Sequence, residues 1–351
     1  MLIALDFESE GVMPISSDEK RSLREQKGVL FEGAVAPPPE QPYRILSVDG
    51  GGLRGLIPLV ILDRLDEAKP GWRDDINMFA GTSTGGLVAL GLAKGMSPRQ
   101  LMDVYVNKGK TIFERSLWHE VANLGDLVGP KYDSTNREAV FLEVLGNNQL
   151  KDYLRENNTK GHVCITSFDL KDQGDVSPEI RNWKAKIFHN IPVAMGENDA
   201  SEYAHRVAMR TSAAPTYFCS YDGFVDGGVF ANNPAMCALA QALDYRLANI
   251  NDIASIKMLS LGTGYTQTHF DDDANWGLAE WSVHLVDLLT DGVLEVADFQ
   301  VRQLLGSQKY VRLTVPLGKG ISLDDPSMIG TLLKKGGRVN IDNAIELIRN
   351  W

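Results

Sequence analysis

The chain has 351 residues, of which 44% are hydrophobic, and its 35 basic and 46 acidic side chains give a formal net charge of −11. This composition is ordinary for a folded globular protein and excludes a disordered, collagen-like or coiled-coil chain. The acidic balance argues against a nucleic-acid partner, because such a protein needs a basic face for the phosphates. It also disfavours firm electrostatic docking on an anionic membrane.

Residues 1–41 differ in composition from the rest of the chain, since a charged run is followed by the three prolines of Pro37–Pro39. Proline continues neither a helix interior nor a central strand. We therefore predict an N-terminal extension over residues 1–41. No linker divides the remainder, and we predict one domain over residues 42–351.

From Tyr43 onward, short β-type runs alternate with longer helical patterns. This alternation is typical of an α/β fold in which helices flank a mostly parallel sheet. The predicted strands are residues 44–48, 78–80, 163–168, 186–188, 224–225, 256–261 and 310–315. The predicted helices are residues 53–67, 86–94, 98–108, 202–210, 234–247, 282–305 and 341–350.

The apolar segments indicate no membrane-spanning helix, since none approaches the roughly 20 residues that a span requires. The N-terminus lacks the pattern of a signal peptide. We expect a cytoplasmic protein whose contact with membranes is peripheral and transient. In the helix predicted over residues 282–305, we expect the apolar stripe to pack in the core rather than to form a lipid-facing lid. The stripe consists of Leu285, Leu288, Leu289, Val296 and Phe299.

The cysteines and histidines indicate no metal site. Cys164, Cys219 and Cys237 lack CxxC spacing, and the six histidines do not cluster with them. So few cysteines in a chain of this length favour a reducing compartment over a disulfide-stapled secreted scaffold. We expect neither a metal nor another cofactor.

The most informative motif is Gly81-Thr82-Ser83-Thr84-Gly85, which fits G-x-S-x-G between a predicted strand and a predicted helix. In that setting the serine occupies a strained turn with its hydroxyl exposed. Backbone amides at the start of the following helix can stabilise developing negative charge. Ser83 is therefore a candidate nucleophile, although a tight packing turn that happens to contain serine would show the same pattern.

A nucleophilic serine needs a base, which is usually a histidine. Of the two late histidines, His269 lies in a polar run and His284 lies on a helix assigned to packing. The others have no paired acidic motif, and we interpret them as structural or surface residues: His119, His162, His189 and His205. A conventional Ser-His-Asp triad therefore has little support.

A second glycine-rich loop, Asp49-Gly50-Gly51-Gly52-Leu53-Arg54-Gly55, directly follows a predicted strand. Successive glycines let consecutive amides point into one concavity that suits a phosphate or an oxyanion. The spacing also matches the dinucleotide pattern G-x-G-x-x-G. However, Asp63 and Asp66 lie too close in sequence, in the same predicted helix, to be the usual ribose-binding acid, and the lysine and terminal Ser/Thr of a P-loop are missing. Arg54 suits an acyl-transfer site for a phosphorylated substrate better.

The third element is Asp226-Gly227-Gly228, which on its own is a common turn. The three elements in this order closely resemble the patatin-like phospholipase family. The stretches 211–218 (TSAAPTYF), 225–234 (VDGGVFANNP) and 260–264 (SLGTG) are also family-like. The resemblance extends from Tyr43 to the C-terminus.

The resemblance implies a three-layer α/β/α fold and a Ser–Asp dyad without a catalytic histidine. Ser83 would be the nucleophile, and Asp226 would accept its proton. The oxyanion hole would consist of the amides of Gly50, Gly51 and Gly52, with Arg54 holding that loop or the lipid phosphate. The motif glycines that complete the pattern are Gly55, Gly81, Gly85, Gly227 and Gly228.

The function implied is that of a lipid acyl hydrolase of the phospholipase A type, which cleaves fatty-acyl esters of membrane phospholipids through an acyl-serine intermediate. One alternative is a phospholipase effector that a cyclic nucleotide activates in bacterial anti-phage defence, which would add a nucleotide activator to the phospholipid partner. A nucleotide-binding protein without activity is a second alternative. A storage or interaction protein that kept the fold is a third, but the intact Ser83 and Asp226 weigh against it.

Overall fold

The computed structural model describes residues 42–112, 135–171, 182–193, 198–215, 217–244, 252–265, 278–318 and 323–351, with the backbone alone for residues 110 and 278–291. All of them belong to one compact unit, residues 39–351. The predicted N-terminal extension, residues 1–41, lies outside the described residues. Within these ranges, no helix has both the length and the apolar character needed to cross a bilayer.

Seven strands of the described chain form one sheet in the order β4–β3–β2–β1–β6–β7, with β5 paired to β3. They are β1 (Tyr43–Val48), β2 (Met78–Thr82), β3 (His162–Asp169), β4 (Lys184–His189), β5 (Phe224–Asp226), β6 (Ile256–Leu261) and β7 (Tyr310–Leu313). Pairing is parallel from β3 through β2, β1 and β6 to β7, whereas β4 and β5 run antiparallel to β3. The prediction of a mostly parallel central sheet is confirmed.

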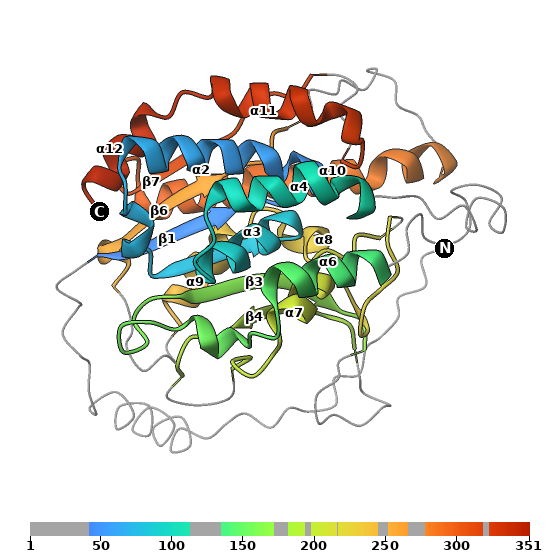
Figure 1. The fold of residues 1–351 in the computed structure, drawn as a ribbon, viewed down its shortest axis with the longest axis horizontal. Coiled ribbons are helices and arrows are strands. Elements are labelled where there is room, and N and C mark those ends of the chain that lie inside the picture. Colours follow the sequence, from blue (N-terminus) through green and yellow to red (C-terminus); the bar gives the residue numbers. More distant parts are fainter. Residues whose placement is uncertain are drawn as a thin grey trace, which may run out of the picture. The chain divides into compact units, whose positions relative to one another are not determined.

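Helices cover both faces of this sheet (Figure 1). One core contains side chains of α2 (Leu56–Ala68), α3 (Thr84–Ala93), α4 (Pro98–Ile112), α6 (Thr135–Leu145), α7 (Ala204–Thr211), α11 (Ile329–Arg338) and α12 (Asp342–Arg349). The other contains side chains of α9 (Ala235–Ala242) and α10 (Leu278–Leu305), and the short α8 (Gly228–Ala231) packs against α10. Turns of 3-10 helix are η1 (Gly52–Gly55), η2 (Trp72–Asp75), η4 (Leu150–Tyr153), η6 (Ile253–Ser255) and η7 (Pro326–Met328).

The strands supply side chains to both cores because successive residues of a strand point to opposite faces. In β1, Leu46 and Val48 belong to the first core, while Tyr43 and Ile45 belong to the second. The sheet is therefore buried on both sides, and the predicted three-layer α/β/α class is confirmed.

Among the described helices, α6, α11 and the four-residue α8 have no counterpart among the predicted elements. The sequence of α11 contains Gly330, Gly336 and Gly337, which disfavour a helix in isolation. Gly336 nevertheless lies against α2, where a Cβ would come within 2.9 Å of the carbonyl oxygen of Ile57. Close packing between the two helices thus offsets the low propensity. Conversely, α9 ends at Ala242, earlier than predicted, and residues 245–250 lie outside the described ranges.

The prediction that the apolar stripe of α10 faces the core is wrong for Val296 and Phe299, which are 55% and 63% exposed. The buried side of this helix consists instead of Leu294, Ala297, Val301 and Leu305. Residues two apart differ by about 200° in direction around a helix, so Val296 and Phe299 lie on the side opposite Leu294 and Val301. Both sides are apolar, and spacing alone could not distinguish them. The side chains of Leu285, Leu288 and Leu289 lie outside the described set.

Candidate active site

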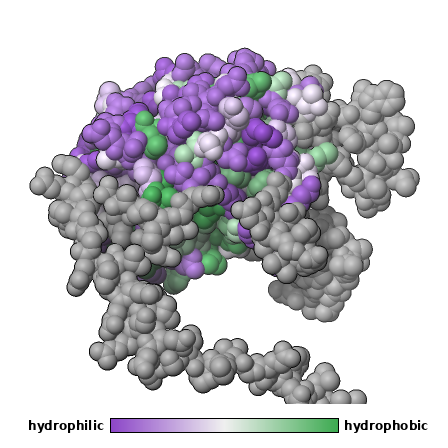
Figure 2. All heavy atoms as spheres, turned by 90° about the horizontal axis from the view of Figure 1, so that it is seen from below, coloured by the Kyte–Doolittle hydropathy of each residue, from purple (hydrophilic) through white to green (hydrophobic). Residues whose placement is uncertain are grey.

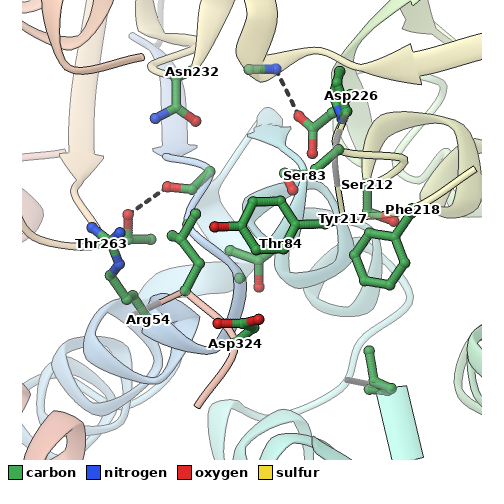
Figure 3. Close-up of a pocket in the computed structure, with 18 of the residues that line it drawn as sticks. Arg54, Ser83, Thr84, Ser212, Tyr217, Phe218, Asp226, Asn232, Thr263 and Asp324 are labelled. Atoms are coloured by element: carbon green, nitrogen blue, oxygen red, sulfur yellow. Dashed lines mark hydrogen bonds between the residues drawn. The ribbon is translucent and has the colours of Figure 1, made fainter. Parts of the chain in front are cut away.

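The register of β3 brings Ser83 and Asp226 together although they are far apart in sequence. Thr82, the last residue of β2, pairs with Thr166, and Asp226 at the end of β5 pairs with Ser167, the next residue of β3. Since β4 occupies the other edge of β3 at Ser167, β5 continues the edge along which β2 runs. The carboxyl ends of β2 and β5 therefore meet, and Figure 3 shows Ser83 beside the carboxylate of Asp226.

Ser83 forms a strained turn between β2 and α3, as the motif predicts. Its φ and ψ are 55° and −122°, a region that residues with a Cβ rarely adopt. The turn is fixed by its surroundings, since the Ser83 amide donates to the Thr211 hydroxyl at 2.9 Å and that hydroxyl donates to the Thr166 carbonyl at 2.6 Å. The hydroxyl of Ser83 is thereby presented at the start of α3, where first-turn amides have no partners within the helix.

The motif glycines allow the segments around Ser83 to approach one another closely. A Cβ on Gly81 would lie 2.1 Å from the Gly85 carbonyl oxygen, and a Cβ on Gly85 would lie 2.1 Å from the Val48 carbonyl oxygen. A Cβ would also collide at Gly55 with the Thr84 hydroxyl (2.6 Å) and at Gly227 with the Thr166 hydroxyl (2.2 Å). These glycines are needed for close packing around the turn, and none of the four lines the cavity described below.

Asp226 is buried, and burial raises the pKa of its carboxyl from 3.8 to about 6. Hydrogen bonds from the Ser83 hydroxyl and the Gly228 amide, together with the positive charge of Arg137, act in the opposite direction without cancelling burial. The Gly228 amide donates to Asp226 Oδ1 at 2.7 Å. At neutral pH the carboxylate is still mostly ionised, and its raised pKa makes it a stronger proton acceptor than an exposed aspartate.

The glycine loop lies directly against the nucleophile. A Cβ on Gly50 would be only 3.3 Å from Ser83 Cβ, and Gly52 has a φ of 56°, a conformation that favours glycine. The Gly50 amide donates to the Asn232 carbonyl at 3.0 Å and is therefore engaged. The amides of Gly51 and Gly52 form no hydrogen bond with any residue in the described part of the chain, and they remain the available donors of this loop.

Residues from the last third of the chain hold this loop in place. Asp49, at its start, forms a buried ion pair with Arg312 of β7, with nitrogen–oxygen distances of 2.5 and 3.2 Å. The Thr263 hydroxyl donates to the Gly50 carbonyl, and the Leu323 carbonyl accepts from the Leu53 amide at 2.8 Å. The loop is thus fixed by an ion pair and two hydrogen bonds, which preorganises its amides.

Ser83, Asp226 and the glycine loop open into a cavity of about 130 Å³. Arg54 lines it at the glycine-loop side, and Tyr217 and Phe218 line it on the side of the segment that follows α7 (Figure 3). The lining also includes Tyr105, Ile112, Phe141, Val229 and Leu294, so that a few convergent polar groups lie among apolar walls. Such a cavity suits a ligand with an apolar chain and one polar reacting group.

The histidines with described side chains lie outside this cavity. His162 bonds to the Tyr43 hydroxyl at 2.6 Å and to the Asn158 carbonyl, and His205 lies 3.1 Å from the Gly146 carbonyl oxygen. His189 is buried on β4. His119, His269 and the side chain of His284 lie outside the described part. Among the described residues, no group of three His, Cys, Asp or Glu side chains could hold a metal ion.

Sequence reasoning missed several residues that complete the site. Arg137 lines the cavity from α6, a helix that carries no recognised motif. Asn232 and Thr263 lie in the stretches 225–234 and 260–264, but their attachment to Gly50 is visible only in three dimensions. Arg312 and Leu323 stand in segments with no motif, and no sequence signal links them to the glycine loop.

Comparisons with known proteins agree with this geometry. Residues 46–239 match the sequence pattern of the patatin-like phospholipase family. Protein teg of Priestia megaterium is 28% identical over 88% of this chain and 99% of its own length. Patatin-like protein 2 of Arabidopsis thaliana is 29% identical over 86% of this chain and 85% of its own. The probable inactive patatin-3-Kuras 1 of Solanum tuberosum is 30% identical over 82% and 83%.

Among solved structures, VipD from Legionella pneumophila aligns with 90% of this chain and 67% of its own, at 12% identity and a TM-score of 0.40. The class of protein that the sequence match defines is an esterase-type hydrolase of lipids. The chain belongs to the patatin-like phospholipase family, because the match to this family covers more than half of the chain.

The raised pKa of Asp226 leads to a prediction about pH. If its carboxylate accepts the serine proton, only the ionised form is active, so kcat/KM should rise with an apparent pKa of about 6 and level off above it. The measurement is kcat/KM for a water-soluble ester from pH 4.5 to 8, with circular dichroism at each pH. Undiminished activity at pH 4.5 in a folded protein would exclude Asp226 as the base.

Proposed function

We propose that this protein is a lipid acyl hydrolase of the phospholipase A type, with residues 42–351 as its catalytic domain. The observation that supports this most strongly is the meeting of Ser83, Asp226 and the two available glycine-loop amides in one largely apolar cavity. Membership of the family agrees with the proposal but does not suffice, because one relative is described as probably inactive.

In the proposed reaction, Ser83 Oγ attacks the carbonyl carbon of a fatty-acyl ester while its proton passes to Asp226. The amides of Gly51 and Gly52 stabilise the oxyanion, and Asp226 then returns the proton to the departing alcohol oxygen of the lysolipid. Water attacks the acyl-Ser83 ester with Asp226 as the base, and the fatty acid leaves as Ser83 is restored. The Gly50 amide takes no part, since the Asn232 carbonyl occupies it.

The experiment that tests this proposal is incubation of the purified chain with mixed phospholipid vesicles, followed by mass spectrometry of fatty acids and lysolipids. We expect equimolar release of both products, and the same rate in excess EDTA, because the proposed chemistry requires no metal. A second set with cyclic nucleotides tests for an activator. Release of phosphorylated headgroups instead of fatty acids would reject the proposal.

The partner in this reaction is a phospholipid surface, and apolar side chains beside the cavity support peripheral contact with it. Val229 lines the cavity and is 40% exposed. Its neighbour Phe230 packs on Phe168, with ring centroids 6.2 Å apart. Phe168 also packs on Trp183, at the same centroid distance of 6.2 Å. Trp183 is 67% exposed. We call these four residues the rim cluster. Aromatic side chains of this kind favour the membrane–water interface. Figure 2 shows a mostly hydrophilic face on which hydrophobic residues appear at several places, with the largest group at its lower middle.

Trp183→Ala should therefore lower fatty-acid release from vesicles several-fold and leave hydrolysis of a water-soluble ester unchanged. The physical reason is the loss of apolar area that enters the lipid interface. Tyr203→Ala is the matched control. Tyr203 is also an exposed aromatic residue, but it lies at the N-terminus of α7 and packs on His205. Equal vesicle activity in wild type and Trp183→Ala would show that the rim cluster does not contact lipid.

A further inference from the structure

Arg137 is a buried cation in the wall of the cavity. Its side chain, on α6, is only 1% exposed and lies among the cavity-lining residues. Nη1 donates to the Ser212 carbonyl at 2.6 Å, and the guanidinium lies 3.9 Å from the centroid of the Phe218 ring. Nε and Nη2 are shielded from solvent and form no hydrogen bond within the described part of the chain. Two donors of a buried charged group are thus unmatched.

The identity of the two unmatched atoms is informative. In a planar guanidinium, Nε–H and one N–H of Nη2 are parallel and project from the same edge. That edge binds two oxygens of a carboxylate or phosphate side by side. Buried donors are rarely left without an acceptor, and a buried charge is normally paired. The edge of Arg137 therefore has the geometry of an oxyanion subsite.

The carboxylate of the site does not fill this role. Asp226 already accepts hydrogen bonds from Ser83 and Gly228, and Arg137 acts on it only through its charge. Burial lowers the pKa of Arg137 to about 10, so that it remains a cation at neutral pH. An anion that reached the edge would neutralise this charge in a dry environment, where such hydrogen bonds are strong.

We propose that the Nε–Nη2 edge of Arg137 binds the phosphodiester oxygens of a glycerophospholipid whose ester lies at Ser83. The inference rests on the proposed function and deepens it, since it makes phosphate a specificity determinant of the cavity. Arg137 lines the same cavity as Ser83 and Asp226, and the Ser212 carbonyl and the Phe218 ring hold its guanidinium there.

The test compares two lipids that differ only in phosphate, a phosphatidylcholine and the diacylglycerol with the same acyl chains, in the same mixed micelles. Arg137→Gln removes the charge, and Arg137→Lys keeps the charge but loses the paired donors. At pH 8, well above the pKa of Asp226, the loss of the Arg137 charge changes the ionisation of that carboxyl little. We expect both variants to lose about 10- to 100-fold in kcat/KM for the phospholipid there, mainly through KM, and less than threefold for diacylglycerol. Equal losses on both lipids, or a shifted pH profile with unchanged lipid preference, would overturn the proposal.

A binding measurement separates this proposal from the proposed function. A diether phosphocholine and the matching diether glycerol, which cannot be hydrolysed, are titrated into Ser83→Ala with and without Arg137→Lys. We expect Arg137→Lys to weaken binding of the phosphocholine alone, even if the wild type hydrolyses neither ester. If Arg137→Lys instead weakens binding of oleate while phosphocholine binding is unchanged, the edge accepts a fatty-acid carboxylate and the proposal is wrong. Circular dichroism verifies that the Lys variant is folded.

Discussion

Ser83→Ala should lower ester hydrolysis by a factor of at least about 10⁴ and abolish covalent labelling by a fluorophosphonate, because no other group in the proposed mechanism can form the acyl intermediate. Alanine keeps the Cβ and the Ser83 turn keeps its hydrogen bond through the backbone amide, so the fold should persist. The rate of fatty-acid release and mass spectrometry of the labelled peptide measure the two effects.

Ser212→Ala is the matched control for this experiment. Ser212 also lines the cavity, but its hydroxyl donates to the Ala208 carbonyl at 2.6 Å and is not free to attack. Labelling should therefore survive in Ser212→Ala. A label found on Ser212 or Ser167 in the wild type would refute the assignment of the nucleophile.

Asp226→Asn should lower turnover on the order of 10²–10⁴-fold, since it removes the proton acceptor but preserves size and the acceptor for the Gly228 amide. His269→Asn and His284→Asn, which replace the candidate bases of a conventional triad, should change turnover by no more than a few-fold. The three variants are compared at matched folded concentration. A dead histidine variant beside an active Asp226→Asn would replace the dyad by a triad.

Asp226→Asn should not destabilise the protein. The folded-state pKa of Asp226 is raised, so ionisation favours the unfolded chain, and this penalty develops from about pH 4 and is complete above about pH 6. A shift from 3.8 to about 6 corresponds to about 3 kcal/mol. Asparagine avoids that penalty, and thermal unfolding at pH 7.5 should show a Tm at or above that of the wild type. Ionisable Asp226 is thus retained at a cost in stability.

The central features of fold and site could be predicted from the sequence because their signals are local. The strands alternate with helices along the chain, and Ser83, Asp226 and the glycine loop each stand in a short motif at a strand end. Ser83 and Asp226 lie together as the family resemblance implies, and their catalytic roles remain predictions. The raised pKa of Asp226 has no local signal in the sequence, because it results from burial of the carboxyl in the folded chain.

What the sequence did not reveal depends on contacts between distant segments. Nothing local shows that the Gly50 amide is occupied by Asn232, or that Arg137 enters the cavity. The exposed side of α10 was misassigned because Val296 and Phe299 are as apolar as its buried residues. No helix was predicted for α11, whose glycines disfavour one in isolation, although Gly336 serves close packing against α2. In each case tertiary packing overrides a weak local preference.

The attachments of the glycine loop limit how this protein can be divided. A fragment that ended at residue 239, where the family match ends, would still contain Ser83 and Asp226. It would lack Thr263, Arg312 and Leu323, and β1 would lose its neighbour β6. Transplanting the motif-bearing segment into another protein would therefore transfer the proposed dyad without the contacts that fix the glycine loop. For any modular use, the portable unit must therefore reach beyond Leu323, and it must also include α11 and α12, because both helices belong to the first core.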